Sequence, residues 1–436
     1  MVKSTGVEGG LTVQQNPLDD FLSDHKKMTE LEHQFGSSFY LFNTEQLRMN
    51  YHKIESAFKS RYSNFIIGYS YKTNYLPYLC KVLSKLGAYA EVVSRLEYDL
   101  ALKIGENPKR IIFNGPLKSR DDIFYAIDNG SLLNLDSLYE IKFVEEYAKQ
   151  YPKRDIKIGL RLNFDISENG VSPLQEGYPI SRFGICVESG TLHQAITELS
   201  AYKNIKIVGL HGHFSTKKRN IEAYQKITET LCKIGKRYIE ESLEYIDIGG
   251  GIYGEVPKSF NLNTPSFDDY ATVVCEIMNR EFAHWTNKPA LILEPGISMV
   301  ANTFQFVAKV IETKTIRGQN FVLVDGSVHN IKPTMHKNNL PMRITSQYPS
   351  STKATVFHVV GYTCMEKDYL AHEVVAELPQ INDFLIFDNV GAYTIVFNPP
   401  FIKERPGIVA VDEDEFMIVR KKETLKQFVN EEIYTF

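Results

Sequence analysis

The sequence has no long hydrophobic run and no strong excess of charge. Its 436 residues contain no apolar stretch approaching the roughly 20 residues that cross a membrane, so no membrane partner is expected. The net charge of -4 gives no basic surface for a nucleic acid. The amino terminus, MVKSTGVEGGLTVQQNP, lacks the apolar core of a secretory signal and predicts a flexible tail.

Cysteine is scarce, with five residues at positions 80, 186, 232, 275 and 364. Their number is odd, and no two are close enough in sequence to form a metal-binding pair, so no metal site is predicted. Reduced thiols of this kind indicate a cytoplasmic compartment. The composition, 43% hydrophobic and 23% charged, is that of an ordinary globular protein. The length fits roughly two to three domains, or one large barrel with a smaller module.

Short apolar runs alternate with amphipathic segments through the first two thirds of the chain. This alternation is typical of a parallel sheet covered on both faces, and the number of units fits an α/β fold of the (β/α)8 barrel type. A doubly wound open sheet is the structural alternative. The predicted strands are residues 65–70, 88–94, 111–115, 132–137, 156–163, 206–215, 245–251 and 290–296.

After about residue 300 the pattern changes to alternating strands with few helical spacers, which predicts a C-terminal antiparallel β-domain. The segment SFYLFN (38–43) is expected to add a strand to that domain. We therefore predict a tail and strand over residues 1–44, a barrel over 45–300 and a β-domain over 301–436.

Polar residues recur at the carboxyl ends of the predicted barrel strands, where the chemistry of such barrels is found. Lys72 ends the first strand, which leaves two interpretations: the strand meets water there, or the amine forms an imine with a carbonyl compound. Glu294 ends an apolar strand before Pro-Gly and needs a cationic partner, because burying a lone carboxylate is costly. The other residues of this kind are Glu91, Arg161, His211, His213, Gly249, Gly250 and Gly251.

Taken singly, these features are weak. Three consecutive glycines let backbone N–H groups approach an anion, but a tight turn explains them as well. His213 alone is as consistent with a structural histidine, and Cys364 with a small buried thiol. Core packing does not explain why all of them occur together at one rim of the predicted barrel.

The order and spacing of the motifs resemble the fold-type III pyridoxal phosphate (PLP) decarboxylases, the group of diaminopimelate, ornithine and arginine decarboxylases. The resemblance runs from FGSSFYLFN to RPGIVAV and implies an alanine-racemase-like barrel with a β-domain. The motifs are YSYKTN, AEVVSRLE, IIFNGPLKS, SRFGI, GLHGHFST, DIGGG, EPG, VDGSVHN, GYTC and GAY.

The resemblance implies a role for each matching residue. Lys72 attaches the cofactor covalently, His213 stacks on its ring, and Glu91 and Arg161 lie nearby. Cys364 reaches the site from the partner subunit of a homodimer and handles a proton after carbon dioxide leaves. The residues implied around the phosphate are Thr216, Gly249, Gly250, Gly251, Gly296 and Tyr393.

Glu294 bears on the type of reaction. A carboxylate against the pyridine nitrogen keeps that nitrogen protonated, so the ring accepts the electrons released at the α-carbon. Alanine racemases resemble this fold but have an arginine there, so Glu294 favours decarboxylation over racemisation.

Two positions depart from the family pattern. Met365 follows the cysteine where relatives have an acidic residue that holds the distal amine of the substrate, and Glu366 or Asp368 could replace it only with a shifted loop. Ile297 stands where the family usually has an arginine near the phosphate. We expect Lys332, Lys217 or Lys218 to compensate. The predicted substrate-binding residues are Lys332, Met365, Ile297, His336 and Tyr393.

These departures predict decarboxylation of an amino acid, or of an amino-acid conjugate, that lacks a free distal amine, in a secondary-metabolite or siderophore-type pathway. The substrate would be free, conjugated or carrier-bound. One alternative is a diaminopimelate, lysine or ornithine decarboxylase of primary metabolism. Others are a PLP-dependent epimerase or elimination enzyme, and a non-catalytic regulator with the decarboxylase fold.

Overall fold

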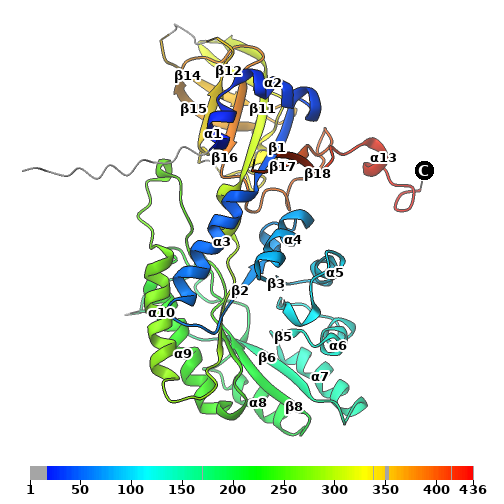
Figure 1. Cartoon of the computed structure of the whole chain (residues 1–436), viewed down its shortest axis with the longest axis vertical. Helices are drawn as coiled ribbons and strands as arrows, with labels where there is room; N and C mark the ends of the chain where they lie inside the picture. The colour runs from blue at the N-terminus through cyan, green and yellow to red at the C-terminus, as the bar shows by residue number, and fades with distance from the viewer. Residues whose placement is uncertain (1–16, 169, 337, 349–352, 414, 436) are drawn as a thin grey trace, which may run out of the picture.

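The computed structural model describes residues 17–435, apart from positions 169, 337, 349–352 and 414. The predicted flexible tail therefore lies almost entirely outside the described residues. Figure 1 shows a barrel and a β-domain stacked end to end, with α3 running from one to the other. No helix among the described residues is both long and apolar enough to span a membrane.

The barrel contains each of the eight strands predicted from the sequence. They are all parallel and pair in the order β5-β4-β3-β2-β10-β9-β8-β6, and a further β5–β6 pairing closes the ring, which excludes the open doubly wound sheet. A short strand, β7 (Ile185–Cys186), pairs outside β6. The strands are β2 (Phe65–Ser70), β3 (Tyr89–Val92), β4 (Ile111–Phe113), β5 (Leu132–Leu135), β6 (Ile156–Asn163), β8 (Ile205–His211), β9 (Tyr245–Asp247) and β10 (Ala290–Leu293).

Helices surround this ring and begin at ordinary sequence signals. A capping box, Ser119 with Asp122, opens α6, and Ser266 with Asp269 opens α10 in the same way. The main helices are α3 (Thr44–Lys59), α4 (Pro77–Leu86), α5 (Arg95–Lys103), α6 (Arg120–Asn129), α7 (Leu138–Gln150), α8 (Thr191–Ser200), α9 (Ile221–Tyr238) and α10 (Phe267–Glu281). Short helical turns are η1 (Tyr71–Thr73), η2 (Pro108–Arg110), η3 (Glu240–Ser242), η4 (Lys258–Phe260), α11 (Ile297–Val300), η5 (Ala301–Thr303), α12 (Val328–Ile331) and α13 (Leu425–Phe428).

The β-domain is mixed rather than purely antiparallel, which corrects the prediction. β1–β17 and β12–β14 pair in parallel, while β11–β12, β14–β15 and β17–β18 are antiparallel. Parallel neighbours need a long connection, and β1 and β17 lie near opposite ends of the chain. The strands are β1 (Ser38–Asn43), β11 (Phe304–Ile316), β12 (Gln319–Val324), β13 (Met342–Thr345), β14 (Thr355–Val360), β15 (Tyr369–Ala376), β16 (Phe384–Asp388), β17 (Gly407–Asp412) and β18 (Glu415–Arg420).

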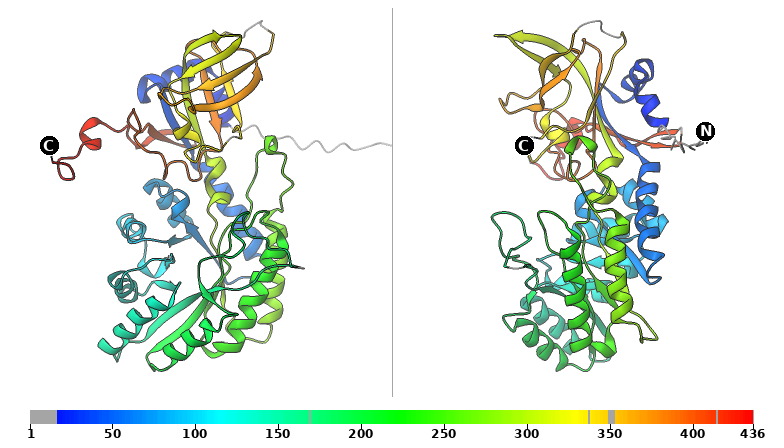
Figure 2. Two further views of the ribbon diagram at one scale, coloured as in Figure 1. Left: turned by 180° about the vertical axis from the view of Figure 1, so that it is seen from behind. Right: turned by 90° about the vertical axis from the view of Figure 1, so that its left-hand side faces the viewer.

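One apolar core continues from the barrel into this domain. β1 lies between β11 and β17, so its Phe42 ring stacks on Phe304 at 4.6 Å between centroids, and both are fully buried. Figure 2 shows the same end-to-end arrangement from behind and from the side. A second core cluster forms where α1 (Pro17–Leu22) and α2 (His25–Phe35) pack on the sheet through Leu22 and Met28. The barrel rim therefore faces the β-domain of its own chain.

Candidate active site

Lys72 lies in η1, one turn beyond the end of β2, and its amine is paired rather than merely solvated. Its Nζ is 2.6 Å from Oε2 of Glu91 on β3, a carboxylate that is 1% exposed. Ser70 donates a hydrogen bond to the same oxygen at 2.5 Å. Burial opposes the charge on Lys72, but Glu91 and Glu294 outweigh it and raise the pKa of the amine. Lys72 is thus a charged amine at the floor of a cavity.

Glu294 follows β10 and belongs to a buried polar network inside the barrel. Asn114 donates to Oε1 of Glu294 at 2.5 Å and to Oε1 of Glu91 at 3.1 Å, so one amide joins the two carboxylates. Nε2 of His211 lies 3.5 Å from Oε2 of Glu294. Burial alone would raise the pKa of Glu294, but His211 and Lys72 lower it, so this carboxylate is ionised. The cationic surroundings expected for Glu294 from the sequence are therefore present.

Asp247, at the end of β9, differs from Glu294 in its protonation. The polar atoms of His211, Asp247 and Glu294 all lie within 4.8 Å of one another. Burial, together with the negative charge of Glu294, raises the pKa of Asp247 well above its usual value, so the carboxyl is protonated. Its Oδ1 accepts a hydrogen bond from the N–H of Gly249 at 2.9 Å. Asp247 thereby holds the glycine-rich junction without adding a third negative charge.

His213 is held in place by the backbone of Gly250 and by Arg161. Nδ1 of His213 accepts a hydrogen bond from the Gly250 N–H at 3.1 Å, and Nη2 of Arg161 donates to the His213 carbonyl at 3.3 Å. Asp136 fixes the guanidinium through a 3.1 Å contact to Nη1. Burial and the charges of Arg161 and Lys72 lower the pKa of His213 to about 3, so the imidazole is neutral. A neutral ring held at its edge can pack against an aromatic ligand.

Two glycines at this rim pack so closely against the rest of the protein that no side chain would fit at either position. A Cβ atom at Gly250 would lie 1.9 Å from the carbonyl oxygen of Glu294, and one at Gly296 would lie 2.2 Å from Oγ1 of Thr73. That hydroxyl is buried and has no hydrogen-bond partner among the described residues. The N–H groups of Gly249 and Gly250 already donate to Asp247 and His213. The unpaired Thr73 hydroxyl, on a residue that lines the cavity, is therefore the donor here that suits a phosphate.

An inner cavity of about 120 Å³ is lined by Lys72, His213 and Glu294, among others. Glu91, Arg161 and Gly249, which were also predicted from the sequence, do not line it. The barrel supplies most of the wall, and Tyr393 enters from the β-domain, with its N–H bonded to the Thr73 carbonyl at 2.9 Å and a φ of +54°. The lining includes Ser70, Lys72, Thr73, Gln175, His213, Phe214, Ser215, Thr216, Arg219, Gly250, Gly251, Glu294, Gly296, Ile297 and Tyr393.

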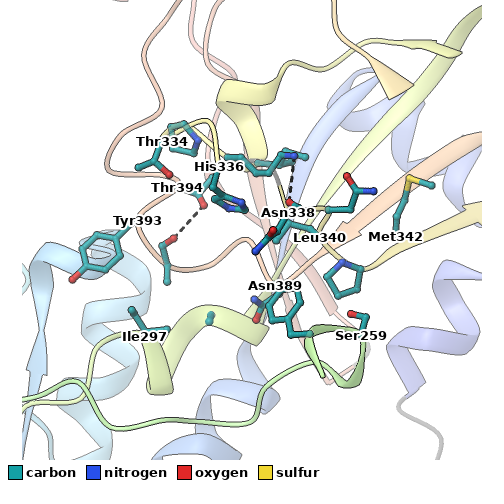
Figure 3. Close-up of a pocket in the computed structure, with 18 of the residues that line it drawn as sticks. Ser259, Ile297, Thr334, His336, Asn338, Leu340, Met342, Asn389, Tyr393 and Thr394 are labelled. Carbon is teal, nitrogen blue, oxygen red and sulfur yellow. Dashed lines mark hydrogen bonds between the residues drawn. The ribbon is translucent and has the colours of Figure 1, made fainter. Parts of the chain in front are cut away.

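A larger outer cavity of about 1430 Å³ adjoins the inner one, because Arg219, Ile297 and Tyr393 line both. Figure 3 shows this outer cavity, with Ile297 on the barrel side and His336 on a loop of the β-domain. Lys332 also lines it. Its described lining contains no aspartate or glutamate.

Several predicted residues therefore lie together and others do not. Cys364 and Met365 occupy the loop between β14 and β15 and line neither cavity of their own chain, and Lys217 and Lys218 are exposed and also line neither. Asp368 cannot replace the missing acidic residue, because its carboxylate is 3% exposed and accepts hydrogen bonds from Ser327, Val328 and Thr363.

Sequence reasoning missed the network residues Asn114 and Asp247 and the cavity-lining residue Arg219. Asn114 directly follows β4 within IIFNG, and Asp247 ends β9 within DIGGG; this position was the available signal. No pattern distinguished Arg219 from the two lysines before it.

The fold and the site define a barrel enzyme whose lysine, ionised carboxylate, flat neutral imidazole and glycine-lined anion site suit a pyridoxal cofactor. Residues 45–301, more than half of the chain, match the family described as "Pyridoxal-dependent decarboxylase, pyridoxal binding domain", and the chain belongs to this family. It is a PLP-dependent carboxy-lyase, as the motifs predicted.

The relatives agree over nearly the whole length. Diaminopimelate decarboxylase of Methanocaldococcus jannaschii is 26% identical over 422 residues, which is 95% of each chain. A probable chloroplastic diaminopimelate decarboxylase of Oryza sativa is 29% identical over 385 residues, 86% of this chain and 75% of that one. A crystal structure of the M. jannaschii enzyme in complex with L-lysine superposes with a TM-score of 0.84 at 25% identity, covering 94% of each chain.

These names bear on the substrate prediction. They favour the primary-metabolism alternative over a conjugated substrate of a secondary pathway, which stays unconfirmed.

Proposed function

We propose that the protein removes the α-carboxylate from an amino acid that carries a second, distal carboxylate, with diaminopimelate as the first candidate. The observation that carries this proposal is the state of Lys332, the residue that directly follows α12. It is 2% exposed and lines the outer cavity, and among the described residues its ammonium donates only to the Asn338 carbonyl, at 3.4 Å. The names of the relatives support the same substrate class.

A buried ammonium without a counter-charge is costly, and a bound carboxylate would relieve that cost. Burial lowers the pKa of Lys332 to about 8, and no carboxylate opposes this shift. Nearby, His336 adds a donor on the same loop. Lysine, which has no distal carboxylate, would leave the Lys332 charge unpaired.

PLP, when bound, accepts the electron pair released as the bond from the α-carbon to the carboxylate breaks. The residues of this chain would do the rest. Lys72 would attach the cofactor, ionised Glu294 would hold a proton on the ring nitrogen, and neutral His213 would pack on the ring face. Each reaction consumes one proton, which Cys364 of a partner subunit would deliver to the α-carbon in a homodimer with shared sites.

The test is carbon dioxide release from diaminopimelate, lysine, ornithine and N-acylated forms of each. We expect diaminopimelate to have the highest kcat/KM, and Lys332→Met to raise its KM by about one to two orders of magnitude, from the value of a charge-assisted hydrogen bond. Lys314→Met, an exposed lysine of the same domain that lines neither cavity, is the matched control. Equal use of lysine and diaminopimelate, unaffected by Lys332→Met, would reject the proposal.

A second candidate is an amino-acid conjugate without a free distal amine. Two observations favour it: Met365 and Ile297 are uncharged where relatives carry charge, and the outer cavity is far larger than the inner one. Turnover of the acylated substrates alone would select this candidate.

A further inference from the structure

The inner cavity lacks the cation that Ile297 would have supplied as an arginine, yet another residue can take its place. Besides Lys72, which is paired with Glu91, Arg219 is the charged cation in the described lining of this cavity. Arg219 and Ile297 line both cavities, so the two residues face the same space from different elements. Ile297 opens α11, whereas Arg219 lies in the loop between β8 and α9.

The loop holds the Arg219 backbone firmly. Its φ of +45° lies in the left-handed region, which a non-glycine residue adopts only where surrounding contacts impose it. Here the Arg219 N–H donates to Oγ1 of Thr216 at 3.1 Å, and the Tyr270 hydroxyl donates to the Arg219 carbonyl. Lys217 and Lys218, at the two preceding positions, are exposed. The turn therefore directs the third cation of the run, and not the first two, to the cavities.

The guanidinium has no hydrogen bond or ion pair with any described residue; it lies over the ring of Tyr253, 5.1 Å from the ring centroid. The Thr216 hydroxyl accepts from the Arg219 N–H, which leaves its own proton free for another acceptor. A planar donor fork and a free hydroxyl beside Gly250 and Gly251 form a donor set for a tetrahedral oxyanion.

We propose that Arg219 binds the phosphate of PLP and so replaces the family arginine that is absent at Ile297. The family arginine stands at the start of α11, whereas Arg219 stands in the loop after β8; both would bind the same phosphate. This role concerns cofactor binding, so it does not depend on which amino acid is decarboxylated.

The test compares PLP with pyridoxal, which lacks the phosphate, by titrating each into the apo-protein and following absorbance and the fluorescence of Trp285. Arg219→Gln should weaken PLP binding about ten- to a hundredfold and leave pyridoxal binding nearly unchanged, as expected for a lost charge-assisted contact. Lys218→Gln, an exposed neighbour, should change neither affinity. Arg219→Lys should fall between the wild type and Arg219→Gln, because it keeps the charge and loses the fork.

A rescue experiment separates a binding role from a structural one. In the double variant R219Q/I297R, the arginine returns to the position usual in the family, and PLP affinity should recover by about tenfold or more over Arg219→Gln. Equal weakening of PLP and pyridoxal, or a lowered melting temperature of the apo-protein that I297R does not reverse, would show that Arg219 is structural. Unchanged PLP affinity with a raised substrate KM would assign Arg219 to a substrate carboxylate and overturn the proposal.

Discussion

Replacing Asp368 with asparagine should destabilise the protein without changing which substrate it prefers. The carboxylate joins two segments: Oδ1 accepts from the Ser327 hydroxyl at 3.1 Å and the Val328 N–H at 2.7 Å, and Oδ2 accepts from Thr363 through its N–H and hydroxyl. Ser327 caps α12 and Val328 begins it, Lys332 directly follows its last residue, and Thr363 precedes Cys364. One buried carboxylate thus positions both the cysteine loop and the helix that presents Lys332.

The magnitude follows from the geometry. Asparagine keeps one of the two carboxylate oxygens as an acceptor. An NH2 group replaces the other oxygen and faces the two donors that this oxygen had accepted from. Two hydrogen bonds to a charged group are then lost, each worth about 1.5–3 kcal/mol, which gives a loss of about 3–6 kcal/mol. The matched control is Glu366→Gln in the same loop, where an exposed side chain should change stability by no more than about 0.5 kcal/mol.

Urea unfolding followed by circular dichroism measures the stability, and initial rates at a temperature where both variants are folded measure the specificity. The ratio of kcat/KM for diaminopimelate to that for lysine should equal the wild-type ratio in Asp368→Asn. If stability were unchanged and the KM for diaminopimelate rose alone, Asp368 would be the partner of the distal amine and the structural role would be wrong.

Further predictions concern the cofactor, the assembly and the outer cavity. Borohydride treatment of the holoenzyme should fix the cofactor to the peptide containing Lys72, and Lys72→Ala should abolish turnover; label on another lysine would refute the assignment. Mixing inactive Lys72→Ala and Cys364→Ala subunits should restore part of the activity, because one site of each heterodimer is intact; no recovery after proven subunit exchange would exclude a shared site. Because burial lowers the pKa of Lys332 to about 8, its ammonium is charged below that pH, so the KM for diaminopimelate should rise as pH increases through about 8. Lys332→Met should remove that rise. Met365→Asp should raise activity on at least one basic amino acid by offering its amine a charge-assisted hydrogen bond of about 1.5–3 kcal/mol; no gain on any basic substrate would contradict this.

The barrel was predictable because its strands are buried on both faces and read as continuous apolar runs, such as FIIGYS and ALIL. The parallel pairs of the β-domain were not, because alternation indicates that a segment is a strand with one buried face but does not identify its neighbour. β1 shows the difference: its membership of the sheet was expected from SFYLFN, whereas its parallel pairing with β17, more than 360 residues along the chain, depends on the tertiary fold.

The candidate site likewise has residues that the sequence predicts and residues that only the tertiary structure reveals. Lys72, Glu91 and Glu294 were found because each ends or follows a barrel strand, where the geometry of the fold brings side chains to one rim. Asp368 could be excluded as a substrate ligand only after its four hydrogen-bond donors were known. Two of them come from Ser327 and Val328, which are distant in sequence, and two come from Thr363. Arg219 could not be separated from Lys217 and Lys218 without the left-handed turn that directs it inward.

The two departures from the family pattern, Met365 and Ile297, lie outside the hydrogen-bonded network around Lys72. The residues around Lys72 form a closed set: Glu91 pairs the amine, Asn114 joins both carboxylates, and the protonated Asp247 adds no charge. Changing any of them would leave a buried group unpaired, which costs more than the contact itself gains. Ile297 and Lys332 face cavities in which a ligand can complete the missing pairings. On the proposed function, the network around Lys72 would constrain the chemistry at the ring, and the charges that line the outer cavity would constrain the far end of the substrate.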